Sequence, residues 1–234
     1  MKLALIGYGK MGKAIEAIAR QRGHEIGLII STANLTGLTK ENLAPCDVAI
    51  EFTNPQSAVI NMQACFNAGI PVVCGSTGWK LSDIADANKN ISLLYASNFS
   101  VGANIFFALN KKLALLMASH PEYKVAVEEI HHTAKKDAPS GTAISLANEI
   151  IAARRELTHW VNNESEEPAA LPIISIRTDP APGTHHVKYV SGIDDIEIIH
   201  TAHNRTGFAT GAVLAAEFLK GKKGIYKMDD VLGI

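Results

Sequence analysis

Short apolar runs alternate with helical spacing of apolar residues through the first 98 residues. The runs are bounded by glycine, proline or polar residues, which is typical of buried strands. They predict strands over Lys2–Ile6, Glu25–Ile30, Asp47–Phe52, Val72–Cys74 and Ser92–Ala96. Apolar spacing and the stop signals Gly23 and Gly69 predict helices from about Met11 and from Pro55 to about Asn67, and a further helix over Leu81–Asn88. Strands that alternate with helices in this way predict a parallel sheet with helices on both faces.

The pattern changes after Asn98. Three runs follow one another with no helix between them, and their alternation predicts a sheet that is mixed, largely antiparallel and covered by helices on one face. The predicted strands are Tyr123–His131, Leu171–Thr178, His185–Val190 and Asp195–Ala202, and the predicted helices are Gly102–His120, Gly141–Leu157 and Thr210–Lys220. The acidic, proline-bearing segment Glu164–Pro172 is expected to be an exposed loop. A second domain of the α+β class is therefore expected.

Composition and charge narrow the classes of partner. The chain has 234 residues, with 22 basic and 23 acidic ones, so it lacks the basic excess of a protein that binds nucleic-acid backbones. The apolar start is interrupted at Gly7, Gly9 and Lys10, which excludes a membrane span or a signal peptide there. Three cysteines without CxxC spacing predict buried thiols in the reducing cytoplasm.

A glycine motif lies between the first predicted strand and the first predicted helix. It reads Gly7-Tyr8-Gly9-Lys10-Met11-Gly12, which is the G-x-G-x-x-G spacing of a Rossmann-type dinucleotide site. The first glycine would permit the tight turn, the second would let a pyrophosphate approach the backbone, and the third would let the helix pack on the sheet. The alternative is a purely structural turn between strand and helix.

The position that reads the cofactor's ribose carries no acid. Ser31 and Thr32 follow the second predicted strand, where a carboxylate would bind the 2′-hydroxyl of NADH. Hydroxyls at this point, with Lys10 or Lys13 to neutralise a 2′-phosphate, favour NADPH, although NADH or dual use stays open and the lysines alone are typical of a solvated surface. Two further loops at strand ends are expected to line the nicotinamide side, namely Gly75-Ser76-Thr77-Gly78 and Ala96-Ser97-Asn98-Phe99.

A second candidate site follows the strand that ends at His131 and His132. A short cationic loop with Lys135 leads to Ser140, a predicted N-cap, and then to Gly141 and Thr142 in the first turn of a helix. Free N–H groups and the positive dipole end suit a carboxylate, Lys135 adds a full charge, and the histidines titrate near neutral pH. The residues predict a site for an anionic substrate.

A metal site and ordinary polar surface are the alternatives for these histidines. Adjacent histidines on a strand point to opposite faces and no third ligand lies nearby in the sequence, so we expect no metal. Two histidines at a strand end are, however, often simply polar surface.

The same segment resembles a family signature. Glu129-x-His131-His132-x-x-Lys135-x-Asp137-Ala-Pro-Ser-Gly-Thr-Ala143 is similar to the motif of the 4-hydroxy-tetrahydrodipicolinate reductases, also called dihydrodipicolinate reductases. Further matching segments are Gly7–Gly12, Gly75–Gly78, Ala96-Ser-Asn-Phe99-Ser-Val-Gly102, Ser175-Ile-Arg177 and Ile225-Tyr-x-Met228-x-Asp230-Val-Leu232. The resemblance spans nearly the whole chain.

The resemblance implies a reaction and a set of roles. The family reduces a cyclic imine dicarboxylate with NADPH or NADH to tetrahydrodipicolinate, on the path to diaminopimelate and lysine. By that resemblance His131 is the acid/base and Lys135 a proton donor, while His132, Lys135, Gly141 and Thr142 hold the substrate carboxylates. Which of His131 and Lys135 delivers the proton stays open. Cytoplasmic homotetramers built through the second domain's sheet are also implied.

The chain departs from the family pattern at a few positions. Ser31-Thr32 replaces the usual acid, and Thr184 replaces the usual acid in the Gly-x-His strand. The expected domains are a cofactor domain of residues 1–98 and 206–234, and a substrate and oligomerisation domain of residues 99–205. The alternatives to a reductase are a non-catalytic NAD(P) sensor or scaffold on the same fold, and a related dehydrogenase of another amino or imino acid.

Overall fold

The computed structural model describes residues 1–84 and 91–234, so part of the helix expected over Leu81–Asn88 lies outside the described residues. Contacts divide the chain into two compact units. Unit 1 consists of Met1–Asn104 and Arg205–Ile234, and unit 2 consists of Ile105–Asn204.

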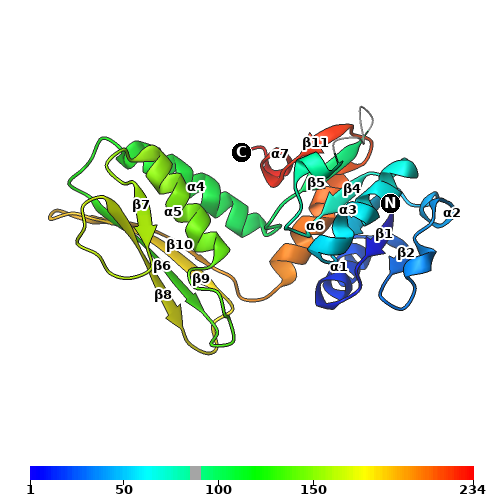
Figure 1. Cartoon of the computed structure of the whole chain (residues 1–234), viewed down its shortest axis with the longest axis horizontal. Coiled ribbons are helices and arrows are strands. Elements are labelled where there is room, and N and C mark those ends of the chain that lie inside the picture. The colour runs from blue at the N-terminus through cyan, green and yellow to red at the C-terminus, as the bar shows by residue number, and fades with distance from the viewer. Residues whose placement is uncertain (85–90) are drawn as a thin grey trace. The chain divides into compact units, whose positions relative to one another are not determined.

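Unit 1 contains a fully parallel six-stranded sheet (Figure 1). Its order is β11-β5-β4-β3-β1-β2, and the strands are β1 (Lys2–Ile6), β2 (Glu25–Ile30), β3 (Val48–Glu51), β4 (Val72–Cys74), β5 (Ser92–Tyr95) and β11 (Gly224–Tyr226). The chain pairs β2 with one side of β1 and β3 with the other, so the strand order reverses at β1. Ligands of open parallel sheets bind at such a reversal, beyond the carboxyl ends of the strands.

Alternation along the strands gives this sheet a core on each face. Leu3 and Leu5 of β1 pack in one cluster and Ala4 and Ile6 in the other. The first cluster lies under α1 (Lys10–Gln21), α6 (Thr206–Leu219) and α7 (Met228–Leu232), and the second lies under α2 (Lys40–Leu43) and α3 (Pro55–Asn67). The predicted parallel sheet with helices on both faces is confirmed.

Several boundaries differ from the expectation. The described part of Leu81–Asn88 is a 3-10 turn, η2 (Leu81–Ile84), and not an α-helix. The segment after Ser31 holds only the 3-10 turn η1 (Leu35–Gly37) and the four-residue α2, because it is too short and polar for a full crossover helix. Helix α6 begins at Thr206 instead of Thr210, so its first turn includes Gly207.

Unit 2 contains a five-stranded mixed sheet of order β10-β9-β6-β8-β7. Its strands are β6 (Lys124–His131), β7 (His159–Val161), β8 (Ala170–Arg177), β9 (Thr184–Val190) and β10 (Asp195–Thr201). Strand β6 is antiparallel to β9 and parallel to β8, and β7 pairs parallel with β8. The mixed sheet is confirmed. Its parallel part includes β7, which was not predicted, and β8 begins at Ala170 inside the expected loop Glu164–Pro172.

Two helices cover one face of this sheet, α4 (Val101–Met117) and α5 (Gly141–Ala153) (Figure 1). The core between them contains Val125 and Val127 of β6 with Val187 and Tyr189 of β9, all nearly inaccessible to solvent. This period of two fixes which residues of β6 and β9 face the helices. Among the described residues, no helix is long and apolar enough to cross a membrane.

Candidate active site

The glycine loop joins β1 to α1, and two of its glycines are required by the protein itself. Gly7 has a φ of +97°, and its N–H donates to the Ile30 carbonyl oxygen at 2.9 Å. A Cβ at Gly7 would overlap the carbonyl of Phe52, and a Cβ at Gly12 would overlap the carbonyl of Gly7. These positions therefore hold the first turn of α1 against the sheet.

Gly9 is different, because nothing in the protein requires its glycine. Its φ of −84° suits any residue, and a Cβ there would meet no heavy atom of residues 1–84 and 91–234 within 4 Å. Gly9 is the N-cap of α1 and contributes no side-chain hydrogen bond, so the first-turn N–H groups of that helix stay available to a ligand. An exposed helix start whose nearest residue lacks a side chain fits a dinucleotide pyrophosphate.

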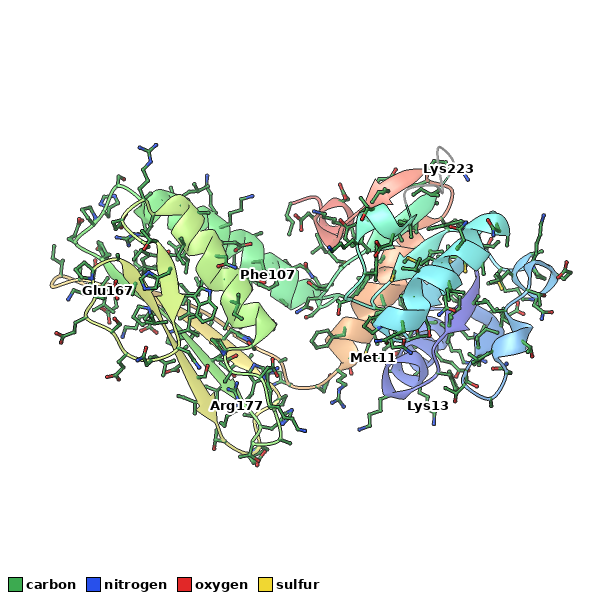
Figure 2. The ribbon with its side chains drawn as sticks, viewed as in Figure 1. Met11, Lys13, Phe107, Glu167, Arg177 and Lys223 are labelled. Atoms are coloured by element: carbon green, nitrogen blue, oxygen red, sulfur yellow. The ribbon has the colours of Figure 1, made fainter. Side chains whose placement is uncertain are left out.

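The remaining predicted cofactor residues lie at the same edge of this sheet. Ser31 and Thr32 follow β2, Gly75–Thr77 follow β4, and Ala96–Phe99 follow β5. Figure 2 shows Met11 and Lys13 on α1, next to the loop. Lys10 and Lys13 are exposed, and the Lys13 Nζ lies 5.9 Å from the centre of the Tyr8 ring, whose hydroxyl donates to Glu16.

Sequence reasoning missed two residues of the loop after β3. The ring of Phe52 packs over Gly75, where any Cβ would overlap it, and lies 5.4 Å from the Phe99 ring. The Thr53 N–H donates to Ser76 Oγ at 2.9 Å. These contacts link the loops after β3, β4 and β5. The signal available in the sequence was the position of Phe52-Thr53 directly after a strand.

Two predicted cofactor residues have their side chains engaged within the protein. The Ser31 hydroxyl donates to Asn34 Oδ1 at 3.1 Å and accepts from the Ala33 N–H at 3.3 Å. The Phe99 side chain is 2% exposed and lies in the core under α6. Phe99 can therefore serve a ligand only through its backbone, and of the two hydroxyl residues after β2, Thr32 is the exposed one.

The predicted substrate residues lie together in unit 2. Glu129 and His131 lie on the helix-covered face of β6, two residues apart, and His132 follows the end of the strand. The chain then turns, and the Lys135 N–H donates to the His132 carbonyl oxygen at 3.1 Å. Lys135 Nζ lies 2.8 Å from both carboxylate oxygens of Asp137. That contact, foremost, lowers the pKa of Asp137.

Helix α5 begins where the sequence predicted. Ser140 is its N-cap, and its Oγ accepts from the Ala143 N–H at 3.2 Å. Gly141 and Thr142 form the first turn, and in the part of the chain that the structure describes no heavy atom lies within 4 Å of a Cβ built at Gly141. Glycine here keeps the positive end of the helix open, as a carboxylate ligand would need.

A buried carboxylate behind these residues had no role in the sequence prediction. Glu129 is 0% exposed, and its Oε1 accepts from the Ser140 N–H at 3.0 Å and from Arg177 Nη2 at 2.9 Å. Arg177, labelled in Figure 2 at the end of β8, is the register neighbour of His131, and His185 on β9 is the register neighbour of Glu129. The sequence did contain a signal: Glu129 is a charged residue at the position that continues the alternation of the apolar residues Val125 and Val127.

Burial and hydrogen bonding set the charge states of this group. Burial raises the pKa of Glu129, but hydrogen bonds from Ser140 and Arg177 outweigh it and leave that pKa below its usual value. Burial lowers the pKa of His131, with Lys135 and Arg177 adding to the effect. Burial and the nearby His131 lower the pKa of His185 to about 4. At neutral pH the site therefore holds an ionised carboxylate and two neutral imidazoles.

The structure brings together three possible metal ligands that do not share ordinary ligand spacing in the sequence. Glu129, His131 and His185 each offer one ligand atom, and these atoms lie within 4.8 Å of one another. The sequence could not reveal this because the third group arrives through cross-strand register. The Glu129 carboxylate is nevertheless occupied by the Arg177 guanidinium and the Ser140 N–H. A full positive charge on the same carboxylate disfavours a cation, so the expectation of no metal stays a prediction.

The comparisons with known proteins each match the same family. The family model for the N-terminal part of dihydrodipicolinate reductase matches residues 1–99, and the model for its C-terminal part matches residues 102–232. A 4-hydroxy-tetrahydrodipicolinate reductase of Christiangramia forsetii is 47% identical and covers 99% of this chain and 98% of its own. One of Staphylococcus aureus is 33% identical, with 99% and 100% coverage. The dipicolinate-bound dihydrodipicolinate reductase of Paenisporosarcina sp. has the same fold, with a TM-score of 0.77, 22% identity and 97% coverage of both chains.

Proposed function

Since the chain belongs to the dihydrodipicolinate reductase family, it is an NAD(P)H-dependent reductase of 4-hydroxy-tetrahydrodipicolinate, and we propose how its residues divide that work. The enzyme belongs to diaminopimelate and lysine biosynthesis. The observation that carries our proposal is the grouping of His131, His132 and Lys135 beside the open start of α5.

Unit 2 supplies the substrate site in this proposal. The two carboxylates of the substrate bind Lys135, His132 and the first-turn N–H groups of Gly141 and Thr142, with the Thr142 hydroxyl as a further donor. The helix start and the ammonium group attract the same anion, so substrate binding and orientation come from electrostatics and geometry. Residues 99–205 form the corresponding functional domain.

Unit 1 supplies the cofactor site, within a functional domain of residues 1–98 and 206–234. The first-turn N–H groups of α1 beside Gly9 would hold the pyrophosphate. The strand-end loops Gly75–Thr77 and Ala96–Phe99 would lie along the rest of the cofactor. When bound, NAD(P)H supplies a hydride from the nicotinamide C4 to an electrophilic ring carbon of the substrate. We assign a preference for NADPH to Thr32, Lys10 and Lys13, because hydroxyls and cations replace the acid that would select a ribose hydroxyl.

The reaction also consumes a proton and releases the substrate hydroxyl as water. His131 and Lys135 are the groups that hold and exchange protons at the substrate. Lys135 is charged, so it balances the substrate's negative charge and can donate, and His131 is neutral at pH 7 and serves as the acid/base partner.

A homotetramer and a cytoplasmic location complete the proposal. The face of the unit 2 sheet that α4 and α5 leave uncovered exposes Ile199, and the adjacent β9–β10 turn exposes Ile193. We assign the interface between copies to this uncovered face. The three free, buried cysteines agree with a reducing compartment. Light scattering of the purified protein tests the tetramer.

The activity is tested by following nicotinamide absorbance when the protein meets cyclic substrate freshly made by the partner synthase. Consumption that depends on both substrate and enzyme is the expected result. A sensor or scaffold would bind NADPH and consume none. A dehydrogenase of another imino acid would reduce a different cyclic imine faster than this dicarboxylate.

A further inference from the structure

Three polar side chains meet on the helix-covered face of the unit 2 sheet. Glu129 and His185 are directly opposite each other on the antiparallel strands β6 and β9, and His131 lies two residues beyond Glu129 on the same face. Glu129 is 0% exposed and His185 is 6% exposed, whereas neighbouring positions on this face are Val127, Val187 and Tyr189. Polar groups in such a core are costly unless each is hydrogen-bonded.

The polar contacts of the His131 side chain involve one of its two ring nitrogens. Its Nε2 lies 3.4 Å from Glu129 Oε2 and 3.4 Å from His185 Nε2. Among the described residues, the other nitrogen, Nδ1, makes no hydrogen bond. It lies beside Gly183, where a Cβ would come within 3.2 Å of it. Gly183 thus leaves room for the Nδ1 edge of the ring.

The neighbours of the two rings decide which nitrogen of His131 carries the proton. The Ser140 hydroxyl accepts from the Ala143 N–H, and its Oγ lies 3.2 Å from His185 Nε2. This leaves the hydroxyl proton free to be donated to His185 Nε2, which then acts as an acceptor. His131 Nε2 then carries a proton that it presents to Glu129 Oε2, because its own lone pair would otherwise face the ionised carboxylate. His185 keeps the Ser140 hydroxyl from competing for that carboxylate. The unprotonated nitrogen of neutral His131 is then Nδ1.

We propose that Glu129 and His185 are positioning residues that keep the proton on Nε2 of His131, so that Nδ1 is the nitrogen that exchanges a proton with the substrate. This deepens, and rests on, the proposed acid/base role of His131. The arrangement follows the general rule that the hydrogen bond at one imidazole nitrogen selects the state of the other. Neither positioning residue needs to touch the substrate.

A matched pair of variants at His185 tests this. His185→Gln keeps an acceptor that reaches toward His131 and Ser140, and His185→Leu fills a similar volume with no polar atom. We expect H185L to lower kcat about 10- to 100-fold while the KM values for substrate and NADPH change less than about threefold. H185Q is expected to recover most of the loss. His159→Ala, at an exposed site on the edge strand β7, is the control and should behave as the wild type.

A second readout does not depend on activity. In the full-length protein with ¹⁵N-labelled histidines at pH 7.5, the His131 signals, assigned by their loss in His131→Asn, should show an unprotonated Nδ1 and a protonated Nε2. In H185L the two tautomers should mix. Because this spectrum is recorded without substrate, it tests the proposal even if the wild type reduces no dicarboxylate, which would refute the proposed function.

Four results would overturn the inference. They are a protonated Nδ1 on neutral His131 in the wild type, an H185L enzyme with unchanged kcat, an H185L loss expressed only in KM, and activity that EDTA abolishes and Zn²⁺ restores. The last result would make Glu129, His131 and His185 a metal site. If H185L does not fold, the test rests on the wild-type histidine spectrum and on the kcat of H185Q. A wild-type spectrum with a protonated Nδ1 and an unprotonated Nε2 on His131 then refutes the proposal.

Discussion

The ammonium group of Lys135 lies 2.8 Å from each carboxylate oxygen of Asp137, so the protein itself places an anion at the residue we assign to the substrate. Asp137 is more than half exposed and belongs to the same loop. A substrate carboxylate must compete with it for Lys135.

Replacing Asp137 with Asn should therefore tighten substrate binding. The pair is exposed, and pairs of this kind contribute about 0.2–1 kcal/mol, so the substrate KM should fall about 1.5- to 5-fold with little change in kcat. Steady-state kinetics at fixed NADPH measure this. A raised KM in D137N would mean that Asp137 orients Lys135 for the substrate.

The glycine loop allows cofactor binding to be separated from folding. Gly9→Ala adds a methyl group that meets none of the described residues, so the melting temperature of the variant should stay close to that of the wild type. The same methyl group would stand where the pyrophosphate approaches, so the Kd for NADPH should rise about tenfold or more. Gly12→Ala should instead lower the melting temperature, because its Cβ would overlap the Gly7 carbonyl. A Kd for NADPH in G9A equal to that of the wild type would show that the pyrophosphate does not bind at this loop.

Much of unit 1 can be predicted from the sequence because its information is local. Leu3 and Leu5 alternate with Ala4 and Ile6, and each strand is bounded by glycine, proline or polar residues, so strands, helices and a parallel sheet follow directly. Strands β7 and β11 were not predicted, because each has only three residues and includes a histidine or a glycine, whereas the three-residue β4 is wholly apolar.

The buried part of the site could not be predicted in the same way. Glu129 meets His185 only through the register of β6 with β9, and His131 neighbours Arg177 only through the register of β6 with β8. Register between strands that are distant in sequence is set by tertiary packing, which local patterns do not encode. The other site residues could be predicted because they lie close together in the sequence, in one loop and one helix start: His131, His132, Lys135, Gly141 and Thr142.

Cofactor preference should respond to charge at Thr32. Thr32→Glu places a carboxylate where a 2′-phosphate is expected, so kcat/KM for NADPH should fall about tenfold or more relative to kcat/KM for NADH. Thr36→Glu, an exposed position in η1, adds the same charge further along the chain and should leave the ratio unchanged. Equal losses with both cofactors in T32E would argue against a 2′-phosphate contact.

Stability should fall as the pH is lowered from about 7 toward 4. The pKa of His185 is about 4 in the folded protein and 6.5 when unperturbed, so the unfolded chain binds more protons in this interval. The free energy of unfolding should therefore decrease by about 1–3 kcal/mol as the pH falls through the window, and it is fully restored above about pH 7. Urea unfolding at a series of pH values measures the slope. H185Q cannot titrate there, so a slope equal to that of the wild type would assign the effect to other groups.

The central claim is that Lys135 holds the substrate and supports its reduction, and its neighbour Lys136 provides the matched control. Both are lysines of the same loop, but Lys136 is exposed and lies outside the proposed site. The most direct measurement is kcat/KM for the cyclic dicarboxylate, at saturating NADPH, in Lys135→Ala and Lys136→Ala. We predict a loss of about 100-fold or more in K135A and a change within about threefold in K136A. Equal losses in the two variants would contradict the account.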